Sequence, residues 1–398
     1  MASILLVFGI FFTTSCALFN ADTKTENETS VENYERALED IREEIENAPD
    51  SVELKVQQAE ILFQIAKSTP VPALRRPYYL NIHETVNEVS ALTGSENSEL
   101  KQITTQAWTL EQSNGVALLQ QDDSENFDKH FHSIIAHFDN ATTVLPDSLV
   151  TYTLKAATYY RHGDVNKAVE TLETASEIDN YSDPDTIEKL AYLYLEAGNF
   201  EASVNRYQAL VDREPENHHY KSGLANAYIL NQHHQNAVAL LRELVDTFPS
   251  RYEYQESLAT ELYFILDNKI STQVSEPGAG QLDKDDFDDV ISSIDEIITI
   301  FDTLETKLPS IQNGLERTAA FYKNAAIKLS QLTAIAPEEL QEEIKNKEAE
   351  LLEKALPLWQ RLNESSPENM DYRKNLYQVY LSLEMEEDAE AIERSLNF

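Results

Sequence analysis

The residues of this sequence that could do chemistry are its histidines, its clustered acids and one pair of arginines. The histidine pairs His218-His219 and His233-His234 are the strongest candidates for a metal site. On one helix they would lie roughly 20 Å apart at about 1.5 Å per residue, which is too far for a single ion to bridge. We interpret them as structural or surface histidines and expect no metal site.

An acidic run from Asp283 to Asp289 has the composition of a calcium-binding loop. Such a loop needs a glycine at its sixth position and a glutamate at its twelfth, where this sequence has Asp288 and Ile294. We therefore expect the run to place negative charge at the N-terminus of the following helix, where the helix dipole stabilises it. Loose calcium binding is the alternative.

Two adjacent arginines, Arg75 and Arg76, lie beside Tyr78 and Tyr79 after a proline-rich stretch, which is unusual in so acidic a chain. Guanidinium groups next to aromatic rings can bind carboxylates or stack on planar groups. The four residues therefore form a possible docking loop for a partner. The alternative is that the arginines pair with Asp or Glu of the same chain.

Motifs for catalysis are absent from the sequence. It contains no GxGxxG, GxSxG, GxxxxGK or HExxH pattern, which are the signatures of dinucleotide, serine-hydrolase, phosphate-loop and zinc-protease sites. We therefore expect no enzyme activity, no cofactor and no small-molecule substrate.

The charge balance limits the kinds of partner. The chain of 398 residues has 70 acidic and 31 basic residues, for a formal net charge of -39. Because nucleic-acid binding needs clustered Lys and Arg that release counterions, we do not expect nucleic acid as a partner. The apolar content of 42% is enough for a large core.

The first 16 residues have the features of an export signal. An apolar run from Ile4 to Phe12 is shorter than the roughly 20 residues that span a bilayer, and Thr13-Thr14-Ser15-Cys16 follows it. This tetrapeptide resembles a lipobox, the bacterial motif that is cut before a cysteine carrying lipid, which implies a lipid anchor on Cys16. Thr13 stands where leucine is usual, so ordinary cleavage with secretion, or an uncleaved segment, is the alternative. The polar residues 17–32 predict a flexible tether.

The elements that could position functional groups come from an internal repeat. Successive stretches close at Pro146, Asn180, Pro215 and Pro249, in steps of 34, 35 and 34 residues. Within each stretch apolar residues recur at helical spacing, which predicts two helices joined by a tight corner. The predicted corners are Gly163, Gly198 and Gln232-His233.

Small residues stand where the two helices would cross, with large residues around them, in the same register in three consecutive stretches. The residues in register are Tyr152, Ala156, Tyr159, Ala168, Leu172 and Ala175; Leu190, Ala191, Tyr194, Ser203, Tyr207 and Leu210; and Leu224, Ala225, Tyr228, Ala237, Leu241 and Leu244. This pattern resembles the tetratricopeptide repeat, whose period is 34 residues. The resemblance implies an all-α fold, a right-handed superhelix (α-solenoid) of about seven to eight helix pairs that binds other proteins.

The repeat pattern also predicts how the chain is divided. We expect degenerate repeat-like helices over residues 33–146 and regular units over residues 147–250. Residues 251–309 form a unit with an inserted loop from Ser271 to Asp289, and residues 310–398 form units with long helices and a C-terminal cap. Within the last segment, Pro337 is expected to begin a long helix.

Partner contacts are expected on the first helix of each unit, which lines the concave groove in this family. The candidate groove residues are Ala157, Tyr160, Arg161, Tyr192, Leu195, Asn226, Ile229, Thr260 and Tyr263. Packing against a neighbouring helix is the alternative for each of them. The carboxylate-clamp pattern of some family members is not matched, because its lysine positions hold Thr153, Glu188, Ser222 and Glu256.

These features together predict a non-catalytic protein-interaction scaffold of the cell envelope, anchored to a membrane only through lipid. A soluble adaptor, periplasmic or secreted, is one alternative. Another is an accessory subunit of an envelope enzyme complex, including a glycan-binding one. A glycan platform would need exposed tryptophans, whereas Trp108 and Trp359 stand at helical core spacings.

Overall fold

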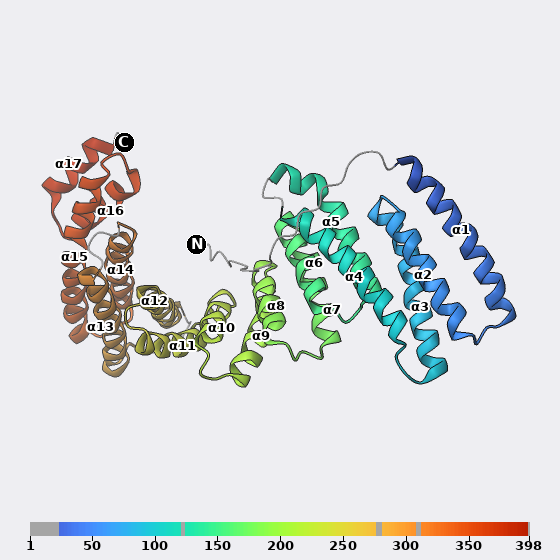
Figure 1. The fold of residues 1–398 in the computed structure, drawn as a ribbon. Helices are drawn as coiled ribbons and strands as arrows, with labels where there is room; N and C mark the ends of the chain where they lie inside the picture. The colour runs from blue at the N-terminus through green and yellow to red at the C-terminus, as the bar shows by residue number, and fades with distance from the viewer. Residues whose placement is uncertain (1–23, 121–123, 276–280, 308–311, 397–398) are drawn as a thin grey trace. The chain divides into compact units, whose positions relative to one another are not determined.

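The structure, a computed structural model, is helical through the residues it describes, which are 24–120, 124–275, 281–307 and 312–396 (Figure 1). Within these ranges it contains no strand. The α-helices are α1 (Lys24–Asn47), α2 (Val52–Ser68), α3 (Arg76–Thr93), α4 (Ser98–Leu119), α5 (Ser124–Val144), α6 (Leu149–His162), α7 (Val165–Ile178), α8 (Pro184–Glu196), α9 (Phe200–Arg213), α10 (His218–Leu230), α11 (His234–Thr247), α12 (Tyr252–Ser275), α13 (Lys284–Lys307), α14 (Gln312–Gln331), α15 (Glu338–Ser365), α16 (Met370–Ser382) and α17 (Glu386–Leu396). Two short 3-10 helices, η1 (Pro72–Leu74) and η2 (Leu332–Ala334), precede α3 and follow α14.

Consecutive helices pack as pairs joined by short connections. After α1, each even-numbered helix packs against the odd-numbered helix that follows it, from α2 with α3 to α16 with α17. For α8 and α9 the contact includes the Ser203 hydroxyl, which donates to the Ala191 carbonyl at 2.8 Å. We call the first helix of each pair helix A and the second helix B. Within the described residues eight such pairs follow one another, which confirms the all-α fold and agrees with the predicted seven to eight helix pairs.

Asparagine residues fix where several helices begin. The side chains of Asn97, Asn199, Asn217 and Asn369 accept backbone N–H groups at the starts of α4, α9, α10 and α16. A helix leaves its first N–H groups without helical partners, and a capping side chain that accepts one of them stabilises the helix by about 1 kcal/mol. The caps therefore help to set the boundaries of the helices.

The corner between helix A and helix B has one geometry in four pairs. Its central residue lies in the left-handed region, with φ of 91° at Gly163, 76° at Gly198, 59° at Gln232 and 56° at Glu384. In each corner this residue's N–H donates to the carbonyl three positions earlier, and the next N–H donates to the carbonyl five positions before its own. The three predicted corners are thus confirmed, and α16 and α17 meet at a fourth corner of the same kind.

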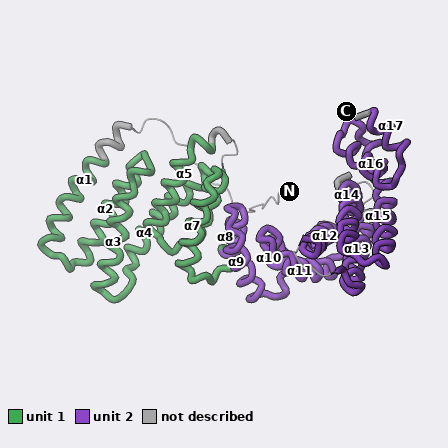
Figure 2. The backbone as a smooth tube through the Cα atoms, turned by 180° about the vertical axis from the view of Figure 1, so that it is seen from behind, with its two compact units in different colours: residues 1–186 green, residues 187–398 purple. Residues whose placement is uncertain are grey.

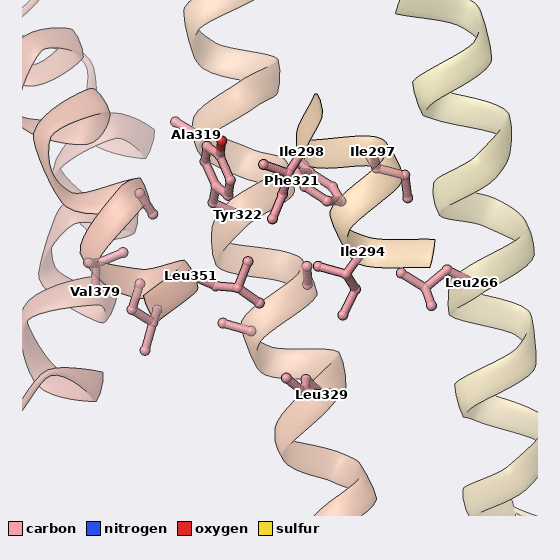
Figure 3. Packing of buried hydrophobic residues seen from close by; sticks show 14 of the residues in the cluster. Leu266, Ile294, Ile297, Ile298, Ala319, Phe321, Tyr322, Leu329, Leu351 and Val379 are labelled. Atoms are coloured by element: carbon pink, nitrogen blue, oxygen red, sulfur yellow. The ribbon is translucent and has the colours of Figure 1, made fainter. Parts of the chain in front are cut away.

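The core depends on small residues beside large rings. At Gly223 of α10 an added Cβ would lie 2.3 Å from Cε1 of the buried Tyr207 ring of α9, so only glycine fits there. Farther along the chain, Phe301 of α13 stacks on Phe321 of α14 with ring centroids 5.1 Å apart. Figure 3 shows this region, where buried side chains of α12 to α16 point toward one another. Trp359 of α15 is also buried there.

The chain divides into two compact units, with the boundary inside α8 (Figure 2). Unit 1 contains the residues up to Thr186, and unit 2 contains those from Ile187 onward.

The structure differs from the sequence prediction in two segments and agrees with it in a third. Residues 24–32, predicted as part of a flexible tether, are the first turns of α1, since no Pro or Gly interrupts the chain before Asn47. The predicted loop from Ser271 to Asp289 is shorter than expected, because α12 continues to Ser275 and α13 begins at Lys284. Pro337 precedes the 28-residue helix α15, as predicted.

The acidic run lies at the start of a helix, as predicted from the sequence. Asp283 accepts the Asp286 N–H at 2.8 Å, and Asp285 and Asp286 occupy the first turn of α13. The negative charge therefore faces the positive end of the helix dipole.

Candidate functional site

The predicted groove residues of unit 2 lie on three A helices, α8, α10 and α12. Asn226 and Thr260 are exposed. The larger side chains are half-buried, which leaves part of each accessible: Tyr192, Leu195, Ile229 and Tyr263. On α10 and α12 an exposed polar residue stands three positions before a half-buried apolar or aromatic one, whereas on α8 both residues are half-buried.

A repeated hydrogen bond extends this register to α14 and α16. Tyr228 donates to Gln208 at 3.2 Å and Tyr322 donates to Asp302 at 2.7 Å, while the Tyr380 hydroxyl accepts from Gln360 at 3.0 Å. Each bond joins helix A to the preceding helix B across 20 residues. The three tyrosines therefore occupy equivalent positions in their repeats.

The residue that follows each of these tyrosines is also equivalent between repeats. These residues, with their counterparts on α8 and α12, form what we call the A-helix row: Leu195, Ile229, Tyr263, Lys323 and Leu381. The sequence interpretation found the first three and missed Lys323 and Leu381. The signal that could have found them is the tyrosine at 322 and 380.

Tyr263 serves the core as well as the surface. Its ring meets Phe321 of α14 edge to face, with centroids 5.9 Å apart. Burial, with a smaller contribution from the charge of Asp267, raises the pKa of Tyr263 above its ordinary value. For this residue the alternative of packing against a neighbouring helix therefore applies in part.

The acidic residues at the clamp positions are paired across neighbouring A helices. Glu188 of α8 pairs with His219 of α10 at 2.5 Å, and Glu256 of α12 pairs with Arg317 of α14 at 2.6 Å. Carboxylates at these positions would repel the carboxylate that a clamp binds, and here they contact a histidine and an arginine of the chain itself. These pairs also link one repeat to the next.

The groove residues predicted in unit 1 lie on α6. Ala157 and Tyr160 are half-buried and Arg161 is exposed. The Arg161 guanidinium donates to the Leu119 carbonyl at 3.1 Å and lies 4.2 Å from the centroid of the Phe127 ring. Arg161 is therefore engaged by α4 and α5 of its own unit, which weakens its assignment as a partner contact.

The predicted docking loop is wrong for two of its four residues. Arg75 and Tyr79 are buried, and both donate to the same carboxylate oxygen of Glu111, at 2.9 and 2.7 Å. The arginine pairs with an acid of its own chain, which was the alternative interpretation. Arg76 remains exposed and Tyr78 is half-buried.

Glu111 is the centre of a buried polar network in unit 1. Its side chain is fully buried, and its second oxygen lies 2.6 Å from Nδ1 of His137. Burial alone would raise the pKa of Glu111, but the bonds from His137 and Tyr79 and the charge of Arg75 outweigh it and hold the pKa below its ordinary value. Glu111 is thus held as a carboxylate.

The network fixes the turn that contains η1. Arg75 Nε donates to the Thr69 carbonyl at 2.7 Å, and Asn140 Nδ2 donates to the Pro72 carbonyl at 2.9 Å. This turn is thereby tied to α4 and α5, the helices that carry Glu111 and Asn140. The arrangement stabilises unit 1 and uses the guanidinium of Arg75 for contacts within the chain.

Members of both histidine pairs take part in packing and in polar contacts within the chain. His218 meets the Phe248 ring edge to face at 4.9 Å, and His234 lies 2.7 Å from Glu261. In the part of the chain that the structure describes, no three His, Cys, Asp or Glu side chains come together as a metal site would require.

Cys16 and the predicted export signal lie outside the described residues. Among the helices that are described, none is long and apolar enough to cross a membrane.

One comparison with known proteins, the family match, agrees with the repeat register. A tetratricopeptide repeat family model matches residues 188–252. Similar solved structures include YrrB, a tetratricopeptide repeat protein with an unusual peptide-binding site, at 15% identity over 59% of this chain and 95% of that one, with a TM-score of 0.37. Others are the C-terminal part of a repeat-containing protein from Cytophaga hutchinsonii (14% identity, 63% and 96% covered, TM-score 0.38) and a repeat protein from Parabacteroides merdae (11% identity, 73% and 99% covered, TM-score 0.33).

No curated protein matches the chain, and no catalytic family is indicated. The family match runs from Glu188 in α8 to Tyr252 at the start of α12, over the most regular part of the sequence. The repeat register and the sequence of helix pairs agree with this match, which identifies residues 188–252 as tetratricopeptide repeats.

Proposed function

We propose that this protein is a non-catalytic scaffold of the cell envelope that binds segments of other proteins along the A-helix row of unit 2. Tetratricopeptide repeats generally act in protein–protein interaction, which makes binding the first expectation. The observation that carries the proposal is the row itself, in which apolar side chains recur at equivalent positions and stay partly accessible. Half-buried apolar and aromatic groups beside polar ones suit an extended or helical partner segment.

Affinity capture with matched variants tests the binding surface. Full-length protein and a Leu195→Glu/Ile229→Glu variant are used to recover partners from the native envelope. The control is Ala239→Glu, which adds a carboxylate at an exposed position of helix B in α11. We expect the control to recover the wild-type set of proteins and the double variant to lose it. Equal recovery by all three proteins would exclude the A-helix row as the binding surface.

We also propose that lipid on Cys16 anchors the protein to a bacterial membrane. The support is the sequence of residues 4–16, with its short apolar run and lipobox-like end. Metabolic labelling with a radioactive fatty acid should label the wild type and leave the Cys16→Ala variant unlabelled. Label that persists in the variant would show that Cys16 does not carry the lipid, and a wild type that is never labelled would favour a soluble secreted adaptor instead.

A glycan-binding role gains no support from the tryptophans. Trp359 is buried, and Trp108 is half-buried with its indole N–H donating to Ser148 and Thr151 at 3.1 and 3.0 Å. Neither presents the open ring face that a sugar platform needs.

A further inference from the structure

One position of the A-helix row differs in kind from the others. Leu195, Ile229, Tyr263 and Leu381 are apolar or aromatic, and the fifth member, Lys323 of α14, carries a charge. Lys323 is half-buried. A charged group among apolar neighbours is costly to desolvate unless an interaction compensates for it.

The described partners of the Lys323 ammonium are neutral. It donates to Oδ1 of Asn375 and, at 3.0 Å, to Oε1 of Gln378, both on α16. Among the side chains that the structure describes, no carboxylate forms an ion pair with it. Burial lowers the pKa of Lys323, and no neighbouring acid opposes that effect.

Other cations of α14 and α15 do have acidic partners. On the same helix, Arg317 pairs with Glu256 at 2.6 Å and Lys328 pairs with Asp267 at 2.6 Å. On α15, Lys347 pairs with Asp295 at 2.9 Å. In a chain with 70 acidic residues against 31 basic ones, a lysine held by amide oxygens alone is an exception.

We infer that Lys323, held in place by Asn375 and Gln378, receives an aspartate or glutamate side chain from the partner segment bound along the A-helix row. A carboxylate brought to this ammonium would form a charge-assisted hydrogen bond, which is about twice as strong as a neutral one. This inference rests on the proposed function of the row and adds the chemistry of its ligand.

The arrangement of the row indicates an internal acidic residue. Apolar positions lie on both sides of Lys323, with Tyr263 on the preceding helix A and Leu381, 49% exposed, on the next. Ile327, one turn further along α14, is 43% exposed. A segment that covers these groups continues past Lys323 in both directions, so its carboxylate comes from a side chain within the segment.

An array of synthetic peptides tests the inference on the full-length protein. Twelve-residue peptides rich in Leu and Phe are each made with a central Glu, with a central Gln, and with Gln plus a free C-terminal carboxylate. All other C-termini are amidated. We expect the wild type to bind the central-Glu peptides about tenfold or more tightly than their Gln partners, as one charge-assisted contact allows. Lys323→Met should bind the Glu and Gln forms equally.

Three control variants keep the interpretation clear. Lys323→Arg retains the charge and should keep the preference for Glu, and Lys328→Met, on another side of α14, should also keep it. Ile229→Glu should bind neither the Glu nor the Gln peptides, because it removes an apolar contact of the row. Thermal unfolding of each variant shows that it is folded.

The outcomes separate the two proposals. If the wild type binds no peptide, the proposed function of the row fails and the inference fails with it. If the wild type binds Glu and Gln forms equally, or if Lys323→Met keeps the preference, the row binds peptides but Lys323 does not select an acid. A preference for the free C-terminal carboxylate over the central Glu would overturn the assignment to an internal side chain.

Discussion

Replacing Glu111 with alanine should destabilise unit 1 strongly. The change removes the shared acceptor of Arg75, Tyr79 and His137 and leaves a guanidinium that is 10% exposed without its counter-charge. Removing one partner of a buried ion pair typically costs about 3–5 kcal/mol of unfolding free energy. Glu111→Gln keeps the side-chain volume and an acceptor oxygen, so we expect a smaller loss of about 1.5–3 kcal/mol, as for hydrogen bonds to charged groups.

The two tryptophans allow each unit to be measured separately. Trp108 lies on α4, the helix that carries Glu111, and Trp359 lies in unit 2. In a Trp359→Phe background, the fluorescence of Trp108 during urea unfolding reports on unit 1 alone. The matched control is Gln106→Ala, an exposed position on the same helix, for which we expect a change within about 0.5 kcal/mol. A loss below about 1 kcal/mol for Glu111→Ala would refute the view that this network stabilises unit 1.

The dependence on pH gives a second test of the same network. Because the folded-state pKa of Glu111 is lowered, its ionised form stabilises the fold above the ordinary glutamate pKa of about 4.3. That contribution decreases as the pH falls past this value and is lost below the folded-state pKa. The difference in unfolding free energy between the wild type and Glu111→Gln should therefore be largest near neutral pH and shrink in acid. A difference that grows as the pH falls would contradict the lowered pKa.

The corners and the close contacts of the core give further predictions. Gln232→Gly and Glu384→Gly should each stabilise the protein by about 0.5–1 kcal/mol, because glycine adopts the left-handed backbone of the corner without steric cost. Gly198→Ala should destabilise it by a similar amount, and thermal unfolding compares the three; a gain of stability in Gly198→Ala would argue against the corner geometry. Gly223→Ala should cost about 1–3 kcal/mol, because the new methyl group overlaps the Tyr207 ring. Fluorescence of the tryptophan in unit 2 measures this loss, and an unchanged midpoint would mean that the ring moves aside freely.

The regular repeats were predictable because their constraints are local. A 34-residue step carries its own small residues, its corner and its capping residue, so residues 147–250 indicate their helices directly. Even the corner at Gln232 was found without a glycine, from its position in the step. Pro337 likewise marks the start of α15, because proline suits the beginning of a helix.

The buried network was not predictable from one stretch of sequence. Arg75 and its acceptor Glu111 are 36 residues apart, and nothing in the sequence around either residue indicates that it is buried. The same limit applies to the row, because the long helices α12 and α13 break the regular step before Lys323 is reached. The register of α14 is recognised from the hydrogen bond between Tyr322 and Asp302, which is visible only in the folded structure.

The stacking of helix pairs also has a consequence for the rate of folding. In the described chain, nearly every helix contact joins elements that are neighbours or next neighbours in sequence, such as α14 with α15 or α4 with α5. Proteins whose contacts are close in sequence fold quickly, because little loop-closure entropy is lost before the contacts form. During synthesis from the N-terminus, each pair can bury its apolar side as soon as its own residues have emerged, without waiting for a distant segment.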